Sequence, residues 1–267
     1  MKNKVVIITG ASSGIGRACA SEFFKRGSRL VLVARTESKL IELVHSIKNL
    51  GGEAIYIVAD VSSETDCSNM IHKTIDAFGR IDILINNAGI SMRALFLDLD
   101  LRDFEKVMQI NFYGTVYCTK YALKHILANK GSIVGVSSIA GHKGLPARTA
   151  YSASKFAMTG FLEALRIENL KKGLHVLVAS PGFTSSNIRQ NAINVSGGHQ
   201  KESPRNEKKM MSADEVAERI VIAVEKRKNN IVLTAQGKLL VFLNKFLPQL
   251  VDSLVFKSLS KEKNSPF

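Results

Sequence analysis

The sequence contains no tryptophan and only three cysteines among its 267 residues. The cysteines, Cys19, Cys67 and Cys118, are scattered and odd in number, so they form neither a metal-binding spacing nor a disulfide framework. Thiols used in this way are typical of a reducing compartment. The absence of tryptophan and of any nucleic-acid-binding motif argues against a surface on which bases would stack.

Long apolar runs are also missing. No stretch reaches the roughly 18 to 20 apolar residues that a membrane-spanning helix needs. The N-terminus is basic, but the apolar run that follows covers only residues 5–8, which is too short for the core of a signal peptide. Together with the cysteines, this predicts a cytoplasmic protein.

Acidic residues are in the minority, because 23 Asp and Glu stand against 37 Lys and Arg and give a formal net charge of +14. An excess of this sign favours anionic partners, namely nucleotide phosphates, nucleic acid or an acidic membrane surface. Lysines that are simply solvated on helix faces explain the excess equally well. We expect no nucleic-acid partner, because charge is the only feature that favours one.

Strand-like and helix-like segments alternate along most of the chain. Short β-branched apolar runs, typical of strands buried on both faces, precede longer stretches with helical spacing of apolar residues. The expected strands cover residues 5–8, 30–33, 55–59, 81–85, 131–138 and 176–179, and the longer expected helices cover 37–50, 63–78, 104–127, 151–170 and 212–226. This alternation predicts an α/β fold with a doubly wound parallel sheet of the Rossmann type. The helix over 104–127 should be interrupted near Asn111 and Gly114, which are poor helix formers.

A glycine-rich segment joins the first expected strand to the helix that follows it. Gly10, Gly14 and Gly16 permit a tight turn in which backbone N–H groups can approach a ligand closely. The start of a helix also attracts anions, so this strand–loop–helix unit suits a pyrophosphate. The spacing G-x-x-x-G-x-G differs from the common dinucleotide pattern G-x-G-x-x-G, and a plain turn is the alternative.

Arg35 follows the second expected strand, where folds of this type carry an acidic residue if they bind NAD. A carboxylate there would bind the ribose 2′-hydroxyl, whereas a guanidinium can bind a 2′-phosphate through two hydrogen bonds. The loop therefore favours NADP(H) over NAD(H), unless Arg35 is merely solvated.

Tyr151 and Lys155 are four residues apart in an expected helix, so their side chains share one face. A free tyrosine has a pKa of roughly 10 and exchanges protons poorly at pH 7. A neighbouring ammonium would lower that pKa and produce a general acid/base. Ser138 lies at the end of the fifth expected strand, where α/β sheets present their chemistry. A Tyr–Lys pair also occurs by chance on surface helices, so the other motifs must supply the context.

In their order and spacing, these motifs resemble those of the short-chain dehydrogenase/reductase family. They are T-G-x-x-x-G-I-G at 9–16, Asp60-Val61, N-N-A-G at 86–89, Asn111, Ser138, Y-x-x-x-K at 151–155 and Pro181-Gly182. The resemblance covers roughly residues 3–235. It implies a six- or seven-stranded Rossmann sheet that binds NAD(P) across the ends of its strands.

The resemblance also implies a role for each residue of the site. Tyr151 would donate and accept the proton, and Lys155 would lower its pKa and bind the nicotinamide ribose. Ser138 would bind the substrate oxygen, and Asn111 would hold a water that relays protons to Lys155. The implied cofactor contacts are Gly10, Ser12, Ser13, Gly14, Ile15, Gly16, Arg35, Asp60, Val61, Asn87, Ala88, Gly89, Tyr151, Lys155, Pro181, Gly182 and Thr184. Many members carry Thr at the position of Ser186, so it stays open whether Thr184 or Ser186 binds the nicotinamide carboxamide.

Substrate specificity should come from the loops over 90–96, 139–146 and 183–211. Within the last of these, residues 191–209 include few apolar residues, and the segment 190–211 could form a lid over the substrate or be a plain insertion. His142 and His199 match no motif position, and we expect them to be loop or pocket residues without a catalytic role.

The chain divides into an expected catalytic domain, 1–236, and a C-terminal extension, 237–267. Apolar residues at helical spacing, interrupted by Pro248, predict two short amphipathic helices in the extension. These helices could contact a membrane through 238–259, pack in an oligomer, or cover the substrate mouth.

These features together predict an NADP(H)-dependent oxidoreductase that interconverts a ketone or aldehyde and an alcohol, with Tyr151 as general acid/base and no metal. The apolar extension and the large loop favour a lipophilic substrate. The family resemblance implies a homodimer or homotetramer. The alternative is a non-catalytic NADP-binding sensor or scaffold, against which the intact set of Asn111, Ser138, Tyr151 and Lys155 argues.

Overall fold

A computed structural model describes residues 1–185, 188–189, 192–194, 197–198, 200 and 210–267 of the chain. Its centre is one parallel sheet with the strand order β3-β2-β1-β4-β5-β6-β7. The strands are β1 Val5–Thr9, β2 Arg29–Ala34, β3 Ala54–Val58, β4 Ile83–Asn86, β5 Ser132–Val136, β6 His175–Ser180 and β7 Asn230–Val232. The predicted fold class is confirmed, and so are the six strands predicted by position. The seventh strand has only three residues, too few for an apolar pattern to mark it.

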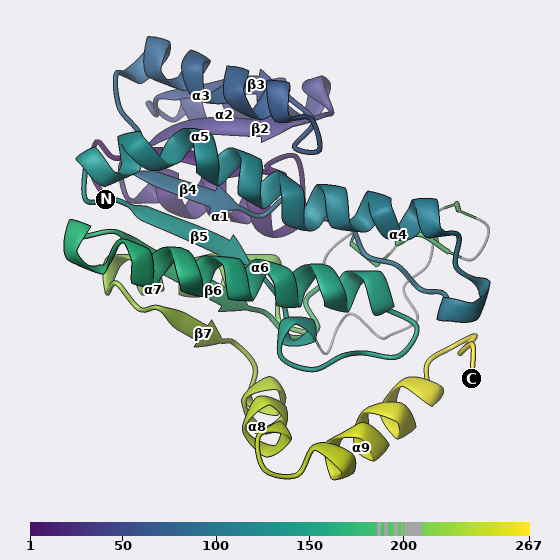
Figure 1. Ribbon diagram of the computed structural model, residues 1–267. Helices are drawn as coiled ribbons and strands as arrows, with labels where there is room; N and C mark the ends of the chain where they lie inside the picture. Colours follow the sequence, from purple (N-terminus) through teal and green to yellow (C-terminus); the bar gives the residue numbers. More distant parts are fainter. Residues whose placement is uncertain (186–187, 190–191, 195–196, 199, 201–209) are drawn as a thin grey trace.

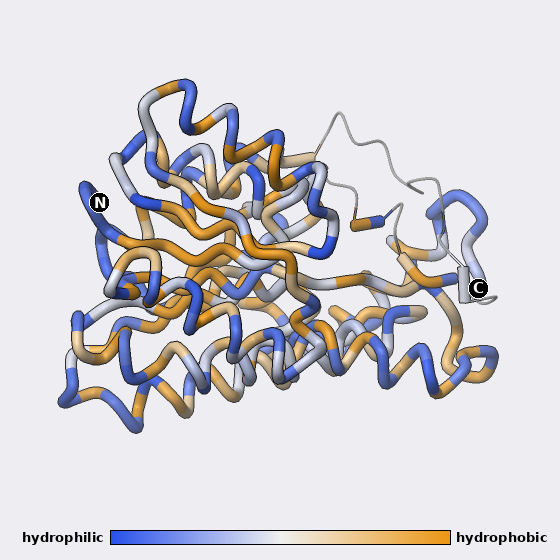
Figure 2. The backbone as a smooth tube through the Cα atoms, turned by 90° about the horizontal axis from the view of Figure 1, so that it is seen from above, coloured by the Kyte–Doolittle hydropathy of each residue, from blue (hydrophilic) through white to orange (hydrophobic). Residues whose placement is uncertain are grey.

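Helices cover both faces of the sheet (Figure 1). On one face lie α1 Gly14–Lys25, α2 Glu37–Asn49 and α7 Ala213–Glu225, and on the other lie α3 Glu64–Phe78, α5 Gly114–Ala128 and α6 Thr149–Glu168. Alternate residues of β1 point into the two cores, so that strand is buried throughout. Figure 2 shows the central strands as nearly continuous apolar segments, as expected of strands covered on both sides.

The predicted interruption of the long helix is present as a change of helix type. After α4 Leu101–Met108 the chain makes a π-helical turn, Gln109–Tyr113, before α5 begins at Gly114. A Cβ atom on Gly114 would lie 2.9 Å from Val61 Cγ2, so this position requires glycine for close packing. The π turn re-aims the side chains around Asn111, as such turns often do at functional sites.

The two helices predicted for the extension are α8 Ala235–Asn244 and α9 Pro248–Ser260. They lie after β7 and project from the side of the molecule on which β6 and β7 lie (Figure 1). Pro248 is the first residue of α9, where its missing N–H costs nothing. In the described part of the chain, every helix is too short or too polar to span a bilayer. The division into 1–236 and 237–267 stays a prediction.

Candidate active site

A cleft of about 370 Å³ lies over the carboxyl ends of β1 and β4, where the strand order of the sheet reverses direction. In doubly wound sheets this is the position at which ligands bind. The structure brings most of the predicted cofactor residues to its wall, namely Gly10, Ser12, Ser13, Gly14, Ile15, Arg35, Asp60, Val61, Asn87, Ala88 and Gly89.

The glycine-rich loop is folded tightly against the end of β4. Gly10 has a φ of +66°, and a Cβ atom on Gly16 would lie only 2.3 Å from the Gly10 carbonyl oxygen. Asn87 Nδ2 donates hydrogen bonds to Thr9 O at 2.9 Å and to Gly10 O at 3.3 Å. Glycine at positions 10 and 16 therefore allows the loop to pack closely on itself and on the residues after β4, which fixes its backbone beside the cleft.

The first turn of α1 offers backbone N–H groups to the cleft. Ser13 occupies the N-cap position of α1 but makes no side-chain cap hydrogen bond. By contrast, Ser63 caps α3 and Ser212 caps α7 through their hydroxyl groups. The uncapped end carries partial positive charge and donors, which fits a pyrophosphate group.

Arg35 and Lys39 make the outer end of the cleft basic. The Arg35 side chain is 64% exposed, and its Nη1 lies 3.8 Å from Asp60 Oδ2. Asp60 Oδ1 in turn accepts hydrogen bonds from the Ser62 backbone and hydroxyl groups. The Arg35 guanidinium is thus loosely held and can reach an anionic ligand.

A smaller pocket of about 110 Å³ adjoins the cleft through Ile15, Asn87 and Gly89, which line both. Its wall contains six more of the predicted residues, Ser138, Tyr151, Lys155, Pro181, Gly182 and Thr184, whereas Gly16 and Asn111 line neither space. Tyr151 and Lys155 come from α6, and Ser138 follows β5, where its Oγ accepts a hydrogen bond from Ala140 N at 3.1 Å. The predicted tyrosine, lysine and serine thus meet in one pocket.

The pKa values of the tyrosine and the lysine move in opposite directions. Burial raises the pKa of Tyr151, and a hydrogen bond from Ser138 and the positive charges of Arg148 and Arg189 offset only part of that rise. Burial lowers the pKa of Lys155 to about 8. The expectation that the ammonium would lower the tyrosine pKa is wrong for this structure. Lys155 Nζ donates to Val136 O at 2.9 Å and lies 5.8 Å from the centre of the tyrosine ring, so burial dominates.

Asn111 is buried behind the pocket, and its amide is fully engaged. Its Oδ1 accepts a hydrogen bond from Ile90 N at 2.8 Å, and its Nδ2 donates to Ile90 O and to Ser154 Oγ, both at 2.9 Å. The side chain therefore fastens the loop after β4 to α6, close to Gly89 and Lys155. The implied role as a water holder stays a prediction.

Arg148 is a residue of the site that sequence reasoning missed. It precedes α6, lines the catalytic pocket and forms an ion pair with Glu262, with 2.9 Å between Nη2 and Oε2. Both side chains are buried. Arg148 lies three residues before Tyr151, one helical turn away, and this spacing is the one signal that could have identified it.

An apolar cavity of about 750 Å³ adjoins the catalytic pocket on the side of the extension. The two share Ile139, Leu145, Gly182 and Phe183 in their walls. The far wall is built by α8 and α9, chiefly Leu239, Leu240, Leu243, Val251, Leu254 and Val255. That the extension covers the substrate mouth was one of the three hypotheses drawn from the sequence, which did not predict the size of this cavity.

Several predicted features fall on residues outside the described part of the chain. Ser186, His199 and residues 201–209 of the expected lid belong to these, so Thr184 is the hydroxyl whose place is known. His142 is a loop residue as expected, and its Nε2 forms a hydrogen bond with Ser180 Oγ at 2.9 Å. Within the described residues, no group of three or more His, Cys, Asp or Glu could hold a metal ion.

Comparison with known proteins gives a consistent result. Residues 4–195 match the short chain dehydrogenase family. The chain is 34% identical over 271 residues to dehydrogenase/reductase SDR family member 7B of Mus musculus, covering 99% of this chain and 84% of that protein. It is 43% identical over 187 residues to 11-beta-hydroxysteroid dehydrogenase-like 2 of Arabidopsis thaliana, covering 69% of this chain but only 60% of that protein.

Solved structures support the fold independently. A short chain dehydrogenase/reductase from Burkholderia phymatum in complex with NAD superimposes with a TM-score of 0.82 at 24% identity, covering 93% of this chain and 95% of that one. An alcohol dehydrogenase from Thermococcus sibiricus complexed with 5-hydroxy-NADP gives a TM-score of 0.75, also at 24% identity, covering 87% of this chain and 96% of that one. At this identity the likeness concerns the fold.

Proposed function

The chain belongs to the short-chain dehydrogenase family of oxidoreductases acting on CH–OH groups, and from that premise we propose that it interconverts a ketone or aldehyde and an alcohol with NADP(H), using Tyr151 as general acid/base. The observation that carries this proposal is the meeting of Ser138, Tyr151 and Lys155 in one pocket, between the cleft and the apolar cavity. Such a pocket can hold a carbonyl group between two hydroxyl groups and a dinucleotide.

Each group of residues at the site would have its own role in the reaction. A nicotinamide dinucleotide in the cleft would supply or accept the hydride. The loop of Gly10 to Gly16 and the start of α1 would hold its pyrophosphate. Ser138 and Tyr151 would donate hydrogen bonds to the substrate oxygen, and Tyr151 would pass it the proton. Lys155, whose pKa is lowered to about 8, would keep its charge near the tyrosine at neutral pH.

Three further proposals concern the partners of the enzyme. Arg35 and Lys39 favour NADP(H), because a 2′-phosphate at the basic end of the cleft would find two cations. The apolar cavity favours a lipophilic substrate. We also propose a cytoplasmic homodimer or homotetramer; the three cysteines are free and buried, which agrees with a reducing compartment.

The substitution Tyr151→Phe tests the proposal. It removes one hydroxyl group from a partly buried ring, so turnover should fall by about 10²- to 10⁴-fold, the usual contribution of a general acid/base. NADPH absorbance with a panel of short and long ketones measures turnover, and isothermal titration measures the Kd for NADPH, which should change less than about threefold because the cofactor cleft is intact. Substantial turnover by the variant would refute the role of Tyr151.

A further inference from the structure

The α8–α9 hairpin carries an apolar surface that the rest of the chain does not cover. Seven large side chains of the hairpin are between 49% and 68% exposed, and six of them form this surface: Leu239, Phe242, Phe246, Leu247, Leu250 and Leu254, the seventh being Phe256. We call this surface the port. A neighbouring face of α9 packs within the chain, because Val251, Val255 and Leu259 are buried in one cluster with Ala140 and Leu145. Packing within the chain therefore explains one side of the hairpin and leaves the port unexplained.

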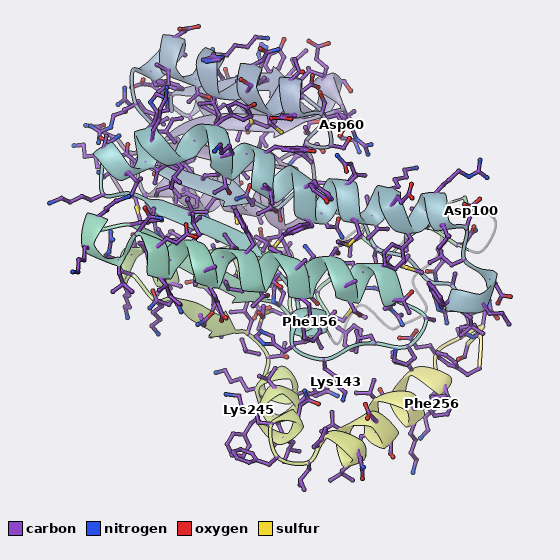
Figure 3. All side chains as sticks on the ribbon, viewed as in Figure 1. Asp60, Asp100, Lys143, Phe156, Lys245 and Phe256 are labelled. Atoms are coloured by element: carbon purple, nitrogen blue, oxygen red, sulfur yellow. The ribbon has the colours of Figure 1, made fainter. Side chains whose placement is uncertain are left out.

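The hairpin is anchored firmly to the catalytic body. Glu262, just after α9, pairs with the buried Arg148, and Asp252 pairs with Lys143 at 2.6 Å. Figure 3 labels Lys143, on the side of the catalytic body that faces the hairpin. At the other end, Thr234 caps α8, and a Cβ atom on Gly182 would lie 2.6 Å from its Oγ1. The port is thus presented in a fixed place next to the catalytic pocket, rather than on a loose tail.

The port is also where the apolar cavity reaches the surface. Leu239 and Leu254 line the cavity and are themselves 58% and 51% exposed. From there the cavity continues past Leu240 and Leu243 to Ile139 and Phe183, which it shares with the catalytic pocket. A hydrocarbon chain that enters at the port would therefore lie in a mainly apolar cavity next to the catalytic pocket.

The charge around the port matches an anionic lipid surface. Five exposed lysines lie in the two helices and the residues after them, Lys238, Lys245, Lys257, Lys261 and Lys263. The two acidic residues of the same segment, Asp252 and Glu262, are both paired with cations of the catalytic body. Lys245, just after α8, and Phe256, on α9, are both exposed and are labelled on the hairpin in Figure 3. Basic residues around exposed aromatic and aliphatic side chains are typical of surfaces that bind anionic bilayers.

A second copy of the chain fits the port less well. A two-fold interface through this surface would bring together the lysines of both copies, which repel one another because Asp252 and Glu262 are already paired within each copy. It would also close the cavity at its mouth. An anionic bilayer neutralises the lysines and leaves the cavity continuous with a hydrocarbon phase.

We propose that the port docks on an anionic bilayer surface, and that a long-chain carbonyl compound or alcohol dissolved in the membrane enters the cavity through it. This inference rests on the proposed function for its second half and deepens it by naming the substrate class. The hydrocarbon chain of this substrate would lie in the apolar cavity, and its carbonyl group would reach Ser138 and Tyr151.

Vesicle co-sedimentation tests the docking directly. The probes are vesicles of phosphatidylcholine alone and of phosphatidylcholine mixed equally with phosphatidylglycerol. The wild-type protein should bind the anionic vesicles, more weakly at high salt, and bind the neutral ones poorly. The double variant Phe242→Ser/Phe246→Ser should bind the anionic vesicles at least about tenfold more weakly, because two exposed rings no longer enter the lipid. The variant Lys245→Glu/Lys257→Glu should show a similar loss without touching any buried side chain.

A matched control removes apolar surface elsewhere. Ile167 and Leu170 are 63% and 68% exposed at the far end of α6 and just beyond it, so Ile167→Ser/Leu170→Ser should bind vesicles as the wild type does. If the wild type ignores anionic vesicles, or if the port and control variants bind alike, the docking proposal is wrong. If sedimentation velocity shows instead that the port variant turns an oligomer into monomers and vesicles are not bound, the port is an interface between copies.

Turnover separates this inference from the proposed function. The ratio of turnover on a long-chain methyl ketone in anionic vesicles to turnover on soluble butanone should fall at least about tenfold in the port variant and stay constant in the control. A ratio unchanged by the port substitutions would overturn the entry route while leaving the reductase assignment intact. No turnover on any ketone would instead refute the proposed function.

Discussion

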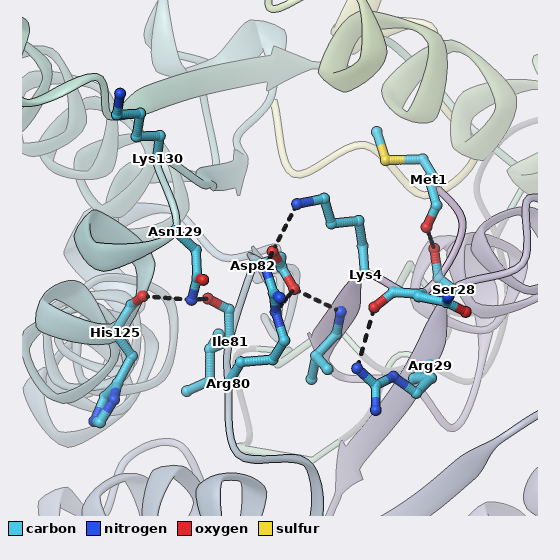
Figure 4. A network of polar contacts seen from close by, with 12 residues as sticks. Met1, Lys4, Ser28, Arg29, Arg80, Ile81, Asp82, His125, Asn129 and Lys130 are labelled. Atoms are coloured by element: carbon cyan, nitrogen blue, oxygen red, sulfur yellow. Dashed lines mark hydrogen bonds and ion pairs between the residues drawn. The ribbon is translucent and has the colours of Figure 1, made fainter.

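The two ends of the sheet both bury charge, but they treat it differently. At the amino ends of the strands, Asp82 is 1% exposed and accepts hydrogen bonds from Lys4, from Val5 N and twice from Arg80, at 2.6 to 3.0 Å (Figure 4). Burial alone would raise the pKa of Asp82, but these donors together lower it. At the carboxyl ends, Lys155 is 3% exposed, and among the described residues its three donors make one hydrogen bond, to Val136 O.

The difference indicates what each end is for. A buried charge that is satisfied on all sides contributes to stability and has no capacity left for a ligand. A buried charge whose pKa is displaced by burial and whose donors are partly unused is typical of a functional site. Asp82 at the amino ends therefore serves to hold the strands together, and Lys155 at the carboxyl ends is available to a ligand or a reaction.

Of the substitutions that test this difference between the two ends, Lys155→Met should have the largest effect, and the effect should be on turnover. Methionine fills a similar volume without a charge, so stability at pH 7 should stay equal or rise, while turnover falls by about 10²- to 10⁴-fold. Circular dichroism measures unfolding, which suits a chain without tryptophan, and NADPH absorbance measures turnover. A variant that unfolds several degrees earlier would show that Lys155 is structural after all.

The pH dependence of stability sharpens the same comparison. The pKa of Lys155 is lowered to about 8 in the folded state, below its ordinary value of 10.5. Between these values the unfolded chain still binds a proton that the folded protein has released, so the free energy of unfolding rises with pH over this range. The wild type should gain up to roughly 3 kcal/mol relative to Lys155→Met between pH 8 and 10.5. A constant difference across this range would contradict the lowered pKa.

The substitution Asp82→Ala should have the opposite effect to Lys155→Met, because it should lower stability and leave turnover unchanged. It leaves Lys4 and Arg80, which are 43% and 40% exposed, to turn towards water, but it removes the shared acceptor at the start of β1 and β4. We expect a loss of roughly 2–4 kcal/mol in unfolding free energy. The kcat/KM of the folded fraction should be unchanged. Thermal unfolding by circular dichroism checks the loss, and unaltered stability would mean that the network is not needed to join the strands.

Features that depend on residues close together in the sequence could be predicted from it, whereas features that depend on residues far apart could not. The Gly10–Gly16 loop, the helix that carries Tyr151 and Lys155, and the break at Asn111 depend on residues close together in the chain. The ion pair of Arg148 with Glu262 joins residues 114 positions apart, and the apolar cavity is built from four separate segments. The direction of the Tyr151 pKa also depends on burial by distant elements, so the local Tyr–Lys spacing gave the wrong sign.

Two arginine–aspartate pairs allow the smallest and most specific test. Arg80 holds the buried Asp82 through two short hydrogen bonds, whereas Arg35 lies 3.8 Å from the half-exposed Asp60. The substitution Arg35→Asp should therefore leave stability unchanged within about 0.5 kcal/mol. It should weaken NADPH binding about 10- to 50-fold, because a carboxylate repels the 2′-phosphate that the guanidinium would bind, and it should affect NADH binding far less. The control Arg80→Ser should do the opposite, lowering stability without changing the ratio of the two cofactor Kd values. Equal losses for NADPH and NADH in the Arg35 variant would show that the basic end of the cleft does not recognise the 2′-phosphate.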